Sequence, residues 1–188
     1  MWVWSIDGSC LHSFAQHWFD SPRRIPRKQT RTPPAVCCVP TLRLTSSPVQ
    51  HDDPRIQLAL DRAAEARGLA YAPYSGFHMG AAVVTDRGTV VPGALVENVS
   101  LGLAMCAERV ALFAGVASDA GRPEVLALVA RLTSGSLTWP CGACLQVAME
   151  LGGPDLVIAA SNGKRLQVAR LGDLAPNLPH KPGQARPG

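Results

Sequence analysis

Three cysteines are the side chains of this sequence whose spacing points most directly to chemistry. Cys141 and Cys144 lie three residues apart in the segment Pro-Cys-Gly-Ala-Cys, and Cys106 precedes them by 35 residues. Residues three apart share one face of a helix, so these two thiols would point the same way if the segment begins a helix. If Cys106 begins a second helix nearby, three thiolates converge. A zinc ion with three protein ligands keeps the open position of a catalytic site.

Glu108 and Arg109 follow Cys106 closely and would complete such a site. Zinc lowers the pKa of a bound water from about 15.7 to about 7. The carboxylate of Glu108 is expected to exchange protons with that water as a catalytic acid and base, and not to bind the metal. Arg109 is expected to donate hydrogen bonds to the thiolates and to offset their negative charge.

Simpler roles remain open for these residues. A Cys-x-x-Cys pair is often a redox pair or half of a structural zinc site, and Glu108 alone could be an exposed helix residue. The other three cysteines lie in residues 1–50, so the rest of the sequence holds no fourth cysteine for a closed structural site. The combination of Cys-Ala-Glu and Pro-Cys-Gly-x-Cys, each before a helical pattern, favours a catalytic zinc site.

The elements that must position these residues alternate between helices and strands. Asp53 and Pro54 are typical of a helix start, and Gly68 is typical of a helix end. The further elements expected from the apolar pattern are strands at 79–85 and 89–97, a helix at 105–117, a strand at 125–132, a helix at 141–151, and strands at 156–160 and 165–169. This order predicts an α/β sandwich around one mixed sheet.

The chain divides into three parts. Residues 1–50 are rich in proline and basic residues and lack a regular apolar period, which predicts a disordered leader. A later start of translation and a transit peptide are alternatives for this segment. Residues 51–178 are expected to form the catalytic domain, and residues 179–188 a flexible tail.

Charge and hydropathy exclude several classes of function. The net charge of +4 lies in residues 1–50, which hold six basic and two acidic residues, whereas the twelve basic and twelve acidic residues of the remainder cancel. A neutral domain does not favour binding to a nucleic-acid backbone. The sequence has no run of about 18 apolar residues that would span a membrane. It also shows no secretory signal, so we expect a cytoplasmic protein with reduced thiols.

The motifs together resemble those of the small three-cysteine cytidine deaminases. The matching segments are 71–82 (Tyr-Ala-Pro-Tyr-Ser-Gly-Phe-His-Met-Gly-Ala-Ala), 96–98 (Val-Glu-Asn), 106–109 (Cys-Ala-Glu-Arg) and 140–144 (Pro-Cys-Gly-Ala-Cys). The resemblance extends over about residues 53–176. It implies a three-layer α/β/α sandwich with a mixed five-stranded sheet, one zinc ion per subunit, and a homotetramer or, less often, a dimer.

The resemblance also implies a role for each motif residue. The three cysteines would bind zinc, and Glu108 would protonate the cytosine ring and then the leaving amine during hydrolysis to uracil and ammonia. Phe77 would stack on the base, Glu97 would accept hydrogen bonds from the sugar, and Ala107 would lie against the substrate. From the residues alone, Phe77 could instead be a core aromatic and Glu97 a solvated charge at the end of a strand.

Several positions that contact the ligand in the family are altered in this chain. Leu95 stands where the family usually has a sugar-binding Asn, Leu101 where it often has Tyr, and Leu145 where it usually has Arg; residues 174–178 lack the aromatic of the family's tail. The expected function is deamination of cytidine or deoxycytidine to uridine or deoxyuridine in pyrimidine salvage. The alternatives are deamination of another cytosine nucleoside, such as a blasticidin S-like antibiotic, and a non-catalytic zinc-containing binding domain.

Overall fold

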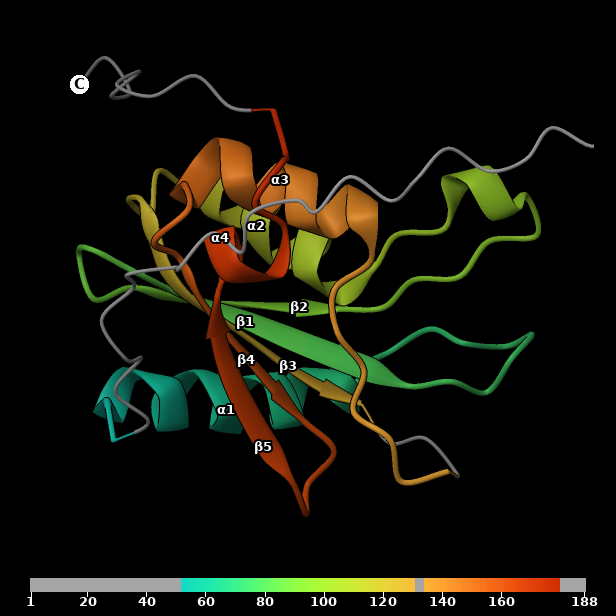
Figure 1. Cartoon of the computed structure of the whole chain (residues 1–188). Coiled ribbons are helices and arrows are strands. Elements are labelled where there is room, and N and C mark those ends of the chain that lie inside the picture. Colours follow the sequence, from blue (N-terminus) through green and yellow to red (C-terminus); the bar gives the residue numbers. More distant parts are fainter. Residues whose placement is uncertain (1–51, 131–133, 180–188) are drawn as a thin grey trace, which may run out of the picture. The chain divides into compact units, whose positions relative to one another are not determined.

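A mixed five-stranded sheet has helices on both of its faces (Figure 1). The computed structural model describes residues 52–130 and 134–179, all within the unit Arg43–Gly188. The strand order is β2-β1-β3-β4-β5; β3 and β4 are parallel, and the other neighbouring pairs are antiparallel. The predicted three-layer α/β/α sandwich is confirmed.

The elements follow the predicted order. The helices are α1 (Pro54–Arg67), α2 (Ala107–Ala117), α3 (Gly142–Gly152) and the single-turn α4 (Leu171–Leu174), with a 3-10 helix, η2, at Leu101–Leu103. The strands are β1 (Met79–Thr85), β2 (Val90–Ala94), β3 (Pro123–Ala130), β4 (Val157–Ser161) and β5 (Leu166–Arg170). Most ends differ from the predicted ones by no more than about two residues, which is usual for helix and strand ends. The two short helices, η2 and α4, were outside the prediction because neither is long enough to produce an apolar period.

The second strand is shorter than the sequence predicts. The apolar pattern predicts a strand to Glu97, whereas β2 ends at Ala94. Beyond that point the chain leaves β1, and Val96 pairs with both Tyr71 and Met105. The segment after β2 is therefore held between the loop that follows α1 and the segment that precedes α2.

Two predictions on the ends of the chain fall outside the described residues. These are the disordered leader at 1–50 and the flexible tail, of which only Pro179 is described. Within 52–130 and 134–179, no helix is both long enough and apolar enough to cross a membrane.

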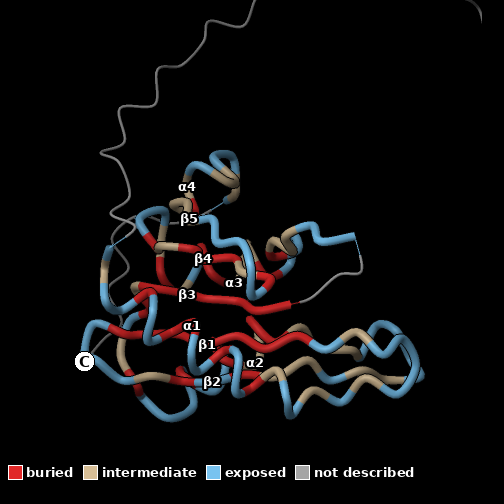
Figure 2. Tube along the Cα trace, turned by 90° about the horizontal axis from the view of Figure 1, so that it is seen from below, coloured by how far each residue is buried: buried red, intermediate tan, exposed pale blue. Residues whose placement is uncertain are grey.

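The two faces of the sheet carry separate apolar cores. Figure 1 shows α1 on one face and α2 and α3 on the other, and Figure 2 shows that the residues of β1 and β3 between them are buried. α1 covers one face with small and branched side chains, among them Ile56 and Ala63. α2 and α3 cover the other face, where Leu112 and Met149 pack against strand residues such as Leu128. β1 is buried along its whole length and β3 along nearly all of it, because both are inner strands with helices on either side.

Two glycines let the helices approach the sheet closely. A Cβ at Gly80 in β1 would lie 2.1 Å from the carbonyl oxygen of Ala63 in α1. A Cβ at Gly93 in β2 would lie 2.4 Å from the carbonyl oxygen of Ala107 and 2.4 Å from the backbone nitrogen of Ala111, both in α2. Because these neighbours are backbone atoms in a close-packed interior, they cannot move aside easily. The glycine in β2 thus sets the distance between the sheet and the helix that carries the first motif.

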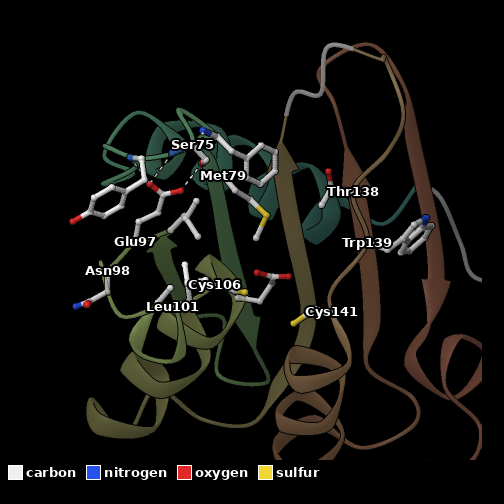
Figure 3. Close-up of a pocket in the computed structure, with 14 residues that line it drawn as sticks. Ser75, Met79, Glu97, Asn98, Leu101, Cys106, Thr138, Trp139 and Cys141 are labelled. Carbon is white, nitrogen blue, oxygen red and sulfur yellow. Dashed lines mark hydrogen bonds between the residues drawn. The ribbon is translucent and has the colours of Figure 1, made fainter. Parts of the chain in front are cut away.

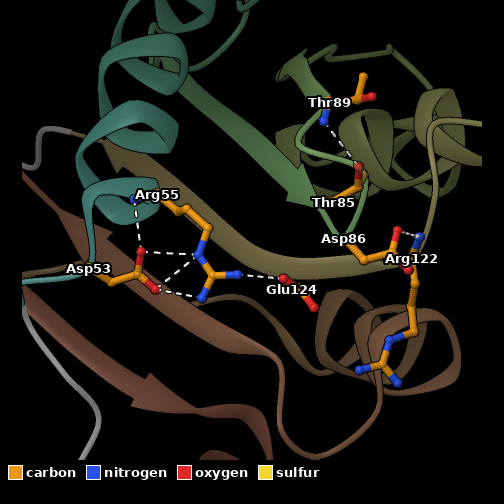
Figure 4. A network of polar contacts seen from close by, with 7 residues as sticks. All are labelled: Asp53, Arg55, Thr85, Asp86, Thr89, Arg122 and Glu124. Atoms are coloured by element: carbon orange, nitrogen blue, oxygen red, sulfur yellow. Dashed lines mark hydrogen bonds and ion pairs between the residues drawn. The ribbon is translucent and has the colours of Figure 1, made fainter.

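Polar contacts hold the start of α1 against the sheet (Figure 4). Asp53 caps the helix, and its carboxylate accepts a hydrogen bond from the backbone N–H of Arg55 at 2.9 Å. The guanidinium of Arg55 forms ion pairs with Asp53 and with Glu124 of β3. The hydrogen bonds from Arg55 hold the pKa of Asp53 below its ordinary value. Nearby, Asp86 accepts a hydrogen bond from the backbone N–H of Arg122 at 2.9 Å.

Candidate active site

Cys106, Cys141 and Cys144 meet where α2 and α3 begin. Cys106 and Cys141 directly precede α2 and α3, and Cys144 lies in the first turn of α3. Their three sulfur atoms all lie within 4.8 Å of one another, and the Sγ atoms of Cys141 and Cys144 are 3.5 Å apart. The fold thus brings together the three residues that the sequence predicts as metal ligands.

This cluster has the donor set of a zinc site with three protein ligands. Thiolates are preferred ligands of zinc, and the N-termini of two helices provide partial positive charge that favours thiolates. Hydrogen bonds from Cys144 and from Arg109 hold the pKa of Cys106 below its ordinary value, so Cys106 ionises before Cys144. In the described part of the chain, the metal-ligating group consists of these three cysteines alone, so a bound zinc ion would keep an open position.

The carboxyl group of Glu108 is buried beside the cluster. The residue is 1% exposed, and its Oε2 atom has no hydrogen-bond partner among the described residues. Burial away from water raises the pKa of Glu108 to about 7. A carboxyl with such a pKa can both release and take up a proton near neutral pH, which suits a general acid and base. Glu108 also lines the pocket described below, so its unpaired oxygen is placed where a ligand could reach it.

Arg109 supports the thiolates from the same turn of α2. Its Nη2 atom donates a hydrogen bond to the Sγ atom of Cys106 at 3.8 Å. This hydrogen bond raises the pKa of Arg109 above its ordinary value, so the guanidinium keeps its charge beside the cluster. The contact fits the supporting role that the sequence predicts, because a positive charge here offsets the charge of the thiolates.

A pocket of about 500 Å³ opens beside the cluster (Figure 3). Its volume lies within the range of sites for small molecules. Figure 3 shows Glu97 and Ser75 at one end, Cys106 and Cys141 at the other, and the side chain of Met79 between them. The pocket therefore joins the proposed metal centre to a polar end through an apolar middle.

The carboxylate of Glu97 is fixed by the loop that follows α1. Its Oε2 atom accepts hydrogen bonds from the backbone N–H groups of Tyr74 (2.9 Å) and Ser75 (3.3 Å), and its Oε1 atom accepts one from the hydroxyl of Ser75. The same hydroxyl accepts a hydrogen bond from the backbone N–H of Phe77 at 3.0 Å. The hydrogen bond from Ser75 contributes most to holding the pKa of Glu97 below its ordinary value. Glu97 is thus an ionised acceptor with a fixed orientation.

Two other predicted substrate contacts differ in their placement. Phe77 lines the pocket and also packs against the core between the sheet and α2, so both of its predicted environments are present. Ala107 is fully buried in the same core and is not among the residues that line the pocket. Its position in the first turn of α2 directs this small side chain towards the sheet. The prediction also omits Ser75, which orients Glu97 through hydrogen bonds that no local sequence pattern indicates.

Comparisons with known sequences agree with this geometry. Residues 54–160 match the family described as the cytidine and deoxycytidylate deaminase zinc-binding region. The chain is 44% identical over 115 residues to a cytidine deaminase of Mycobacterium tuberculosis, an alignment that covers 61% of this chain and 82% of that protein. It is 42% identical over 106 residues to a cytidine deaminase of Halalkalibacterium halodurans, which covers 56% of this chain and 79% of that protein.

Solved structures of similar proteins share the fold. The crystal structure of a cytidine deaminase from Burkholderia pseudomallei matches with a TM-score of 0.61 and 40% identity, covering 69% of this chain and 99% of that chain. The crystal structure of the cytidine deaminase from Mycobacterium tuberculosis matches with a TM-score of 0.56 and 43% identity, covering 65% of this chain and 94% of that chain. With its three-cysteine cluster and its match over residues 54–160, this chain belongs to the cytidine deaminase family.

Proposed function

We propose that this protein hydrolyses the 4-amino group of cytidine or deoxycytidine to give uridine or deoxyuridine and ammonia, a reaction of pyrimidine salvage. The observation that carries the proposal is the carboxyl of Glu108, which is buried beside the three thiols, lines a pocket of suitable size, and has one oxygen without a hydrogen-bond partner among the residues that the structure describes. The similarity to proteins named cytidine deaminase supports the same reaction. A non-catalytic zinc domain would have no need for such a carboxyl, which disfavours that alternative.

Zinc is the metal that fits the donor set of the cluster. Cys106, Cys141 and Cys144 would hold one zinc ion per subunit, and Arg109 would offset part of the charge of the thiolates. When bound there, zinc supplies a Lewis acid that makes water a nucleophile near neutral pH.

Glu108 carries the two protons that the reaction moves. Replacing the amino group by oxygen sends one proton of the attacking water to ring nitrogen N3 and the other to the amine, which leaves as ammonia. The carboxylate of Glu108 takes each proton from the water and delivers it to the ring and then to the amine. Its pKa of about 7 allows both the uptake and the release of these protons.

The rest of the pocket positions the nucleoside. Phe77 and Met79 provide apolar surface for the flat base between the two polar ends. Glu97, which is ionised and held by Ser75, accepts a hydrogen bond from a sugar hydroxyl at the end away from the cysteines. With the sugar bound at that end, the amino-bearing edge of the ring would lie beside Glu108 at the other end of the pocket.

We further propose that the enzyme is a homo-oligomer, either a tetramer or a dimer, in the cytoplasm. Val99, Leu101 and Leu103 are 81%, 86% and 68% exposed beside the pocket, and adjoining exposed apolar residues favour a protein contact. A reducing compartment suits a site that needs three free thiols. Light scattering after size-exclusion chromatography tests the assembly, and a fully active monomer would contradict it.

A panel of cytosine nucleosides tests the proposed reaction. Zinc-loaded protein is incubated with cytidine, deoxycytidine and blasticidin S, and the loss of cytosine absorbance and the release of ammonia are measured. Turnover of cytidine or deoxycytidine is the expected result. Turnover of blasticidin S alone would assign the enzyme to a nucleoside antibiotic, and no turnover of any of them would favour a binding domain.

A further inference from the structure

Residues 134–140 lead from β3 towards α3 and form one wall of the pocket. Thr138 and Trp139 of this segment line the pocket, as does Cys141 directly after it. Figure 3 shows Thr138 and Cys141 on the side of the pocket opposite Glu97. The 134–140 segment contains neither helix nor strand. Its position therefore depends on contacts with other parts of the fold.

The 134–140 segment is held at both of its ends. At the end next to α3, the carbonyl of Cys141 accepts a hydrogen bond from the backbone N–H of Leu145 at 2.9 Å. At the other end, the carbonyl of Gly135 accepts a hydrogen bond from the Nδ2 atom of Asn162 at 2.8 Å. Among the residues that the structure describes, Asn162 provides the hydrogen bond that joins the 134–140 segment to another part of the chain.

The parallel pairing of β3 and β4 brings Asn162 to this segment. The two strands run in the same direction, so their carboxyl ends lie side by side, and Val129 pairs with Ser161. Asn162 directly follows β4 at the edge of the sheet where the chain also leaves β3. Ligands of α/β sheets commonly bind outside this edge. Asn162 does not itself line the pocket, so its contact with a ligand would be indirect.

The turn between β4 and β5 fixes the side chain of Asn162. The residue is 9% exposed, and its Oδ1 atom accepts hydrogen bonds from the backbone N–H groups of Lys164 (3.0 Å) and Arg165 (2.8 Å). Such a turn needs only the acceptor, which Asp supplies as well as Asn does. The amide nitrogen, which Asp lacks, takes no part in the turn and donates to Gly135 instead.

We propose that Asn162 is a positioning residue of the active site, which holds the 134–140 segment where Thr138 and Trp139 can meet the substrate. This inference rests on the proposed function, since it concerns the binding of the nucleoside. Without the amide of Asn162, one end of the segment is released, while the other end stays attached to α3 through Cys141. Only molecules with the segment in place then bind substrate fully, so the apparent affinity falls by the fraction in place.

Asn162→Asp tests this role because it removes the donor and keeps both acceptors of the turn. The KM of zinc-loaded protein, measured with the better of cytidine and deoxycytidine, should rise at least about threefold, as expected for the loss of one hydrogen bond. Both kcat and zinc content should stay within about twofold of the wild type, because the helices that carry Glu108 and the cysteines are not displaced. Any smaller rise in KM overturns the proposal. A loss of zinc or of kcat with an unchanged KM would place the effect at the metal centre and would overturn it as well.

Ser161→Ala is the matched control in the same turn. The hydroxyl of Ser161 accepts a hydrogen bond from the backbone N–H of Gly163 at 3.0 Å. The control therefore removes a hydrogen bond of the turn but keeps the one to Gly135, and its KM should equal that of the wild type. An equal rise in KM in both variants would show that the turn as a whole affects the pocket. Asn162→Ser, whose hydroxyl can cap the turn but is too short to reach Gly135, replaces Asn162→Asp if that variant does not fold.

A fluorine label on tryptophan reports the position of the segment without any measurement of activity. The protein is labelled with fluorotryptophan, and the resonance of Trp139 is assigned from its absence in Trp139→Phe. This resonance should shift or broaden in Asn162→Asp and should match the wild type in Ser161→Ala. An unchanged Trp139 resonance in Asn162→Asp would show that the segment keeps its place without the amide, and the proposal would be wrong.

Failure of this inference differs from failure of the proposed function. If the zinc-loaded wild type deaminates no cytosine nucleoside, the proposed reaction itself is wrong, and the fluorine resonance alone then decides whether Asn162 positions the segment. If the wild type deaminates cytidine or deoxycytidine and Asn162→Asp keeps the same KM, the reaction stands and the role of Asn162 falls.

Discussion

The Nη2 atom of Arg109 lies 3.8 Å from the Sγ atom of Cys106, one turn further along the start of α2. Glu108 lies between them in the sequence and is buried against the same cluster. A single helical turn therefore carries a predicted metal ligand, the positive charge that stabilises its thiolate, and the proposed acid and base. This arrangement makes the charge of Arg109 testable separately from the chemistry of Glu108.

Replacing Arg109 by Gln should weaken zinc binding while leaving the fold intact. The substitution removes the positive charge and the hydrogen bond that stabilise the thiolate of Cys106. Loss of a group that supports a metal ligand typically lowers metal affinity about 10- to 100-fold. Titration against a chromogenic zinc chelator measures this affinity. Arg62→Gln, on the exposed side of α1, is the control. Equal zinc affinities in the two variants would show that Arg109 does not support zinc binding.

Replacing Gly93 by Ala should displace α2 and reduce both stability and activity. The new Cβ would lie 2.4 Å from backbone atoms of Ala107 and Ala111, so helix and sheet must separate. Overpacking of this kind costs about 1–3 kcal/mol. Chemical unfolding measures the loss of stability. A lower kcat/KM reports that the residues at the start of α2 have been displaced.

A matched glycine on α2 itself provides the control for that substitution. A Cβ at Gly115 would meet only a side-chain carbon of Val91, at 3.8 Å. Gly115→Ala should therefore stabilise the protein by about 0.5–1 kcal/mol, because alanine favours a helix more than glycine does. Equal effects of the two substitutions would show that close approach at Gly93 is not what positions α2.

Local sequence signals predicted the order of the main elements, and the three cysteines that they single out as candidate ligands meet in the structure. Asp53 and Pro54 mark the start of α1 because capping depends on residues adjacent in the chain. The three cysteines could be assigned to one site because each lies in or next to the first turn of a helix, where the direction of side chains follows from spacing. Their actual convergence required the sheet that places the two helices side by side.

Contacts between distant segments could not be predicted in the same way. The hydrogen bonds from Ser75 to Glu97 join residues 22 apart in the sequence, and neither the turn around Ser75 nor the strand pattern before Glu97 signals them. The early end of β2 at Ala94 has the same origin, because Val96 pairs with segments outside the hairpin. For Ala107, the position next to Cys106 suggested the pocket, whereas the side chain lies in the core because α2 packs on the sheet, a contact between distant segments that local spacing does not show.

Replacing Asp53 by Ala should destabilise the protein at neutral pH and much less in acid. Loss of a helix cap costs about 0.5–2 kcal/mol. The pKa of Asp53 is lower in the folded protein than in the unfolded chain, so its contribution is complete above the unfolded pKa of about 4. As the pH falls through the folded pKa, the carboxylate of Asp53 in the wild type becomes protonated, so its contribution to stability is lost.

Urea unfolding of the metal-free wild type and of Asp53→Ala, at pH 7 and at pH 3, measures how the stabilising effect of Asp53 depends on pH. The difference in stability between wild type and Asp53→Ala should be smaller at pH 3. Asp52→Ala is the control, since Asp52 is exposed and is not the capping residue. A difference that stays constant between the two pH values would show that the charge of Asp53 contributes nothing to the cap.

The most direct test of the account is to measure zinc content and turnover together in Glu108→Gln. This substitution keeps the shape of the side chain and leaves Cys106, Cys141 and Cys144 unchanged, but it removes the group that takes up and releases protons. The variant should bind about one zinc ion per subunit, as the wild type does, and deaminate cytosine nucleosides at least about a thousandfold more slowly. Near-normal turnover with zinc bound would contradict the role of Glu108, and a wild-type enzyme without stoichiometric zinc would contradict the metal centre itself.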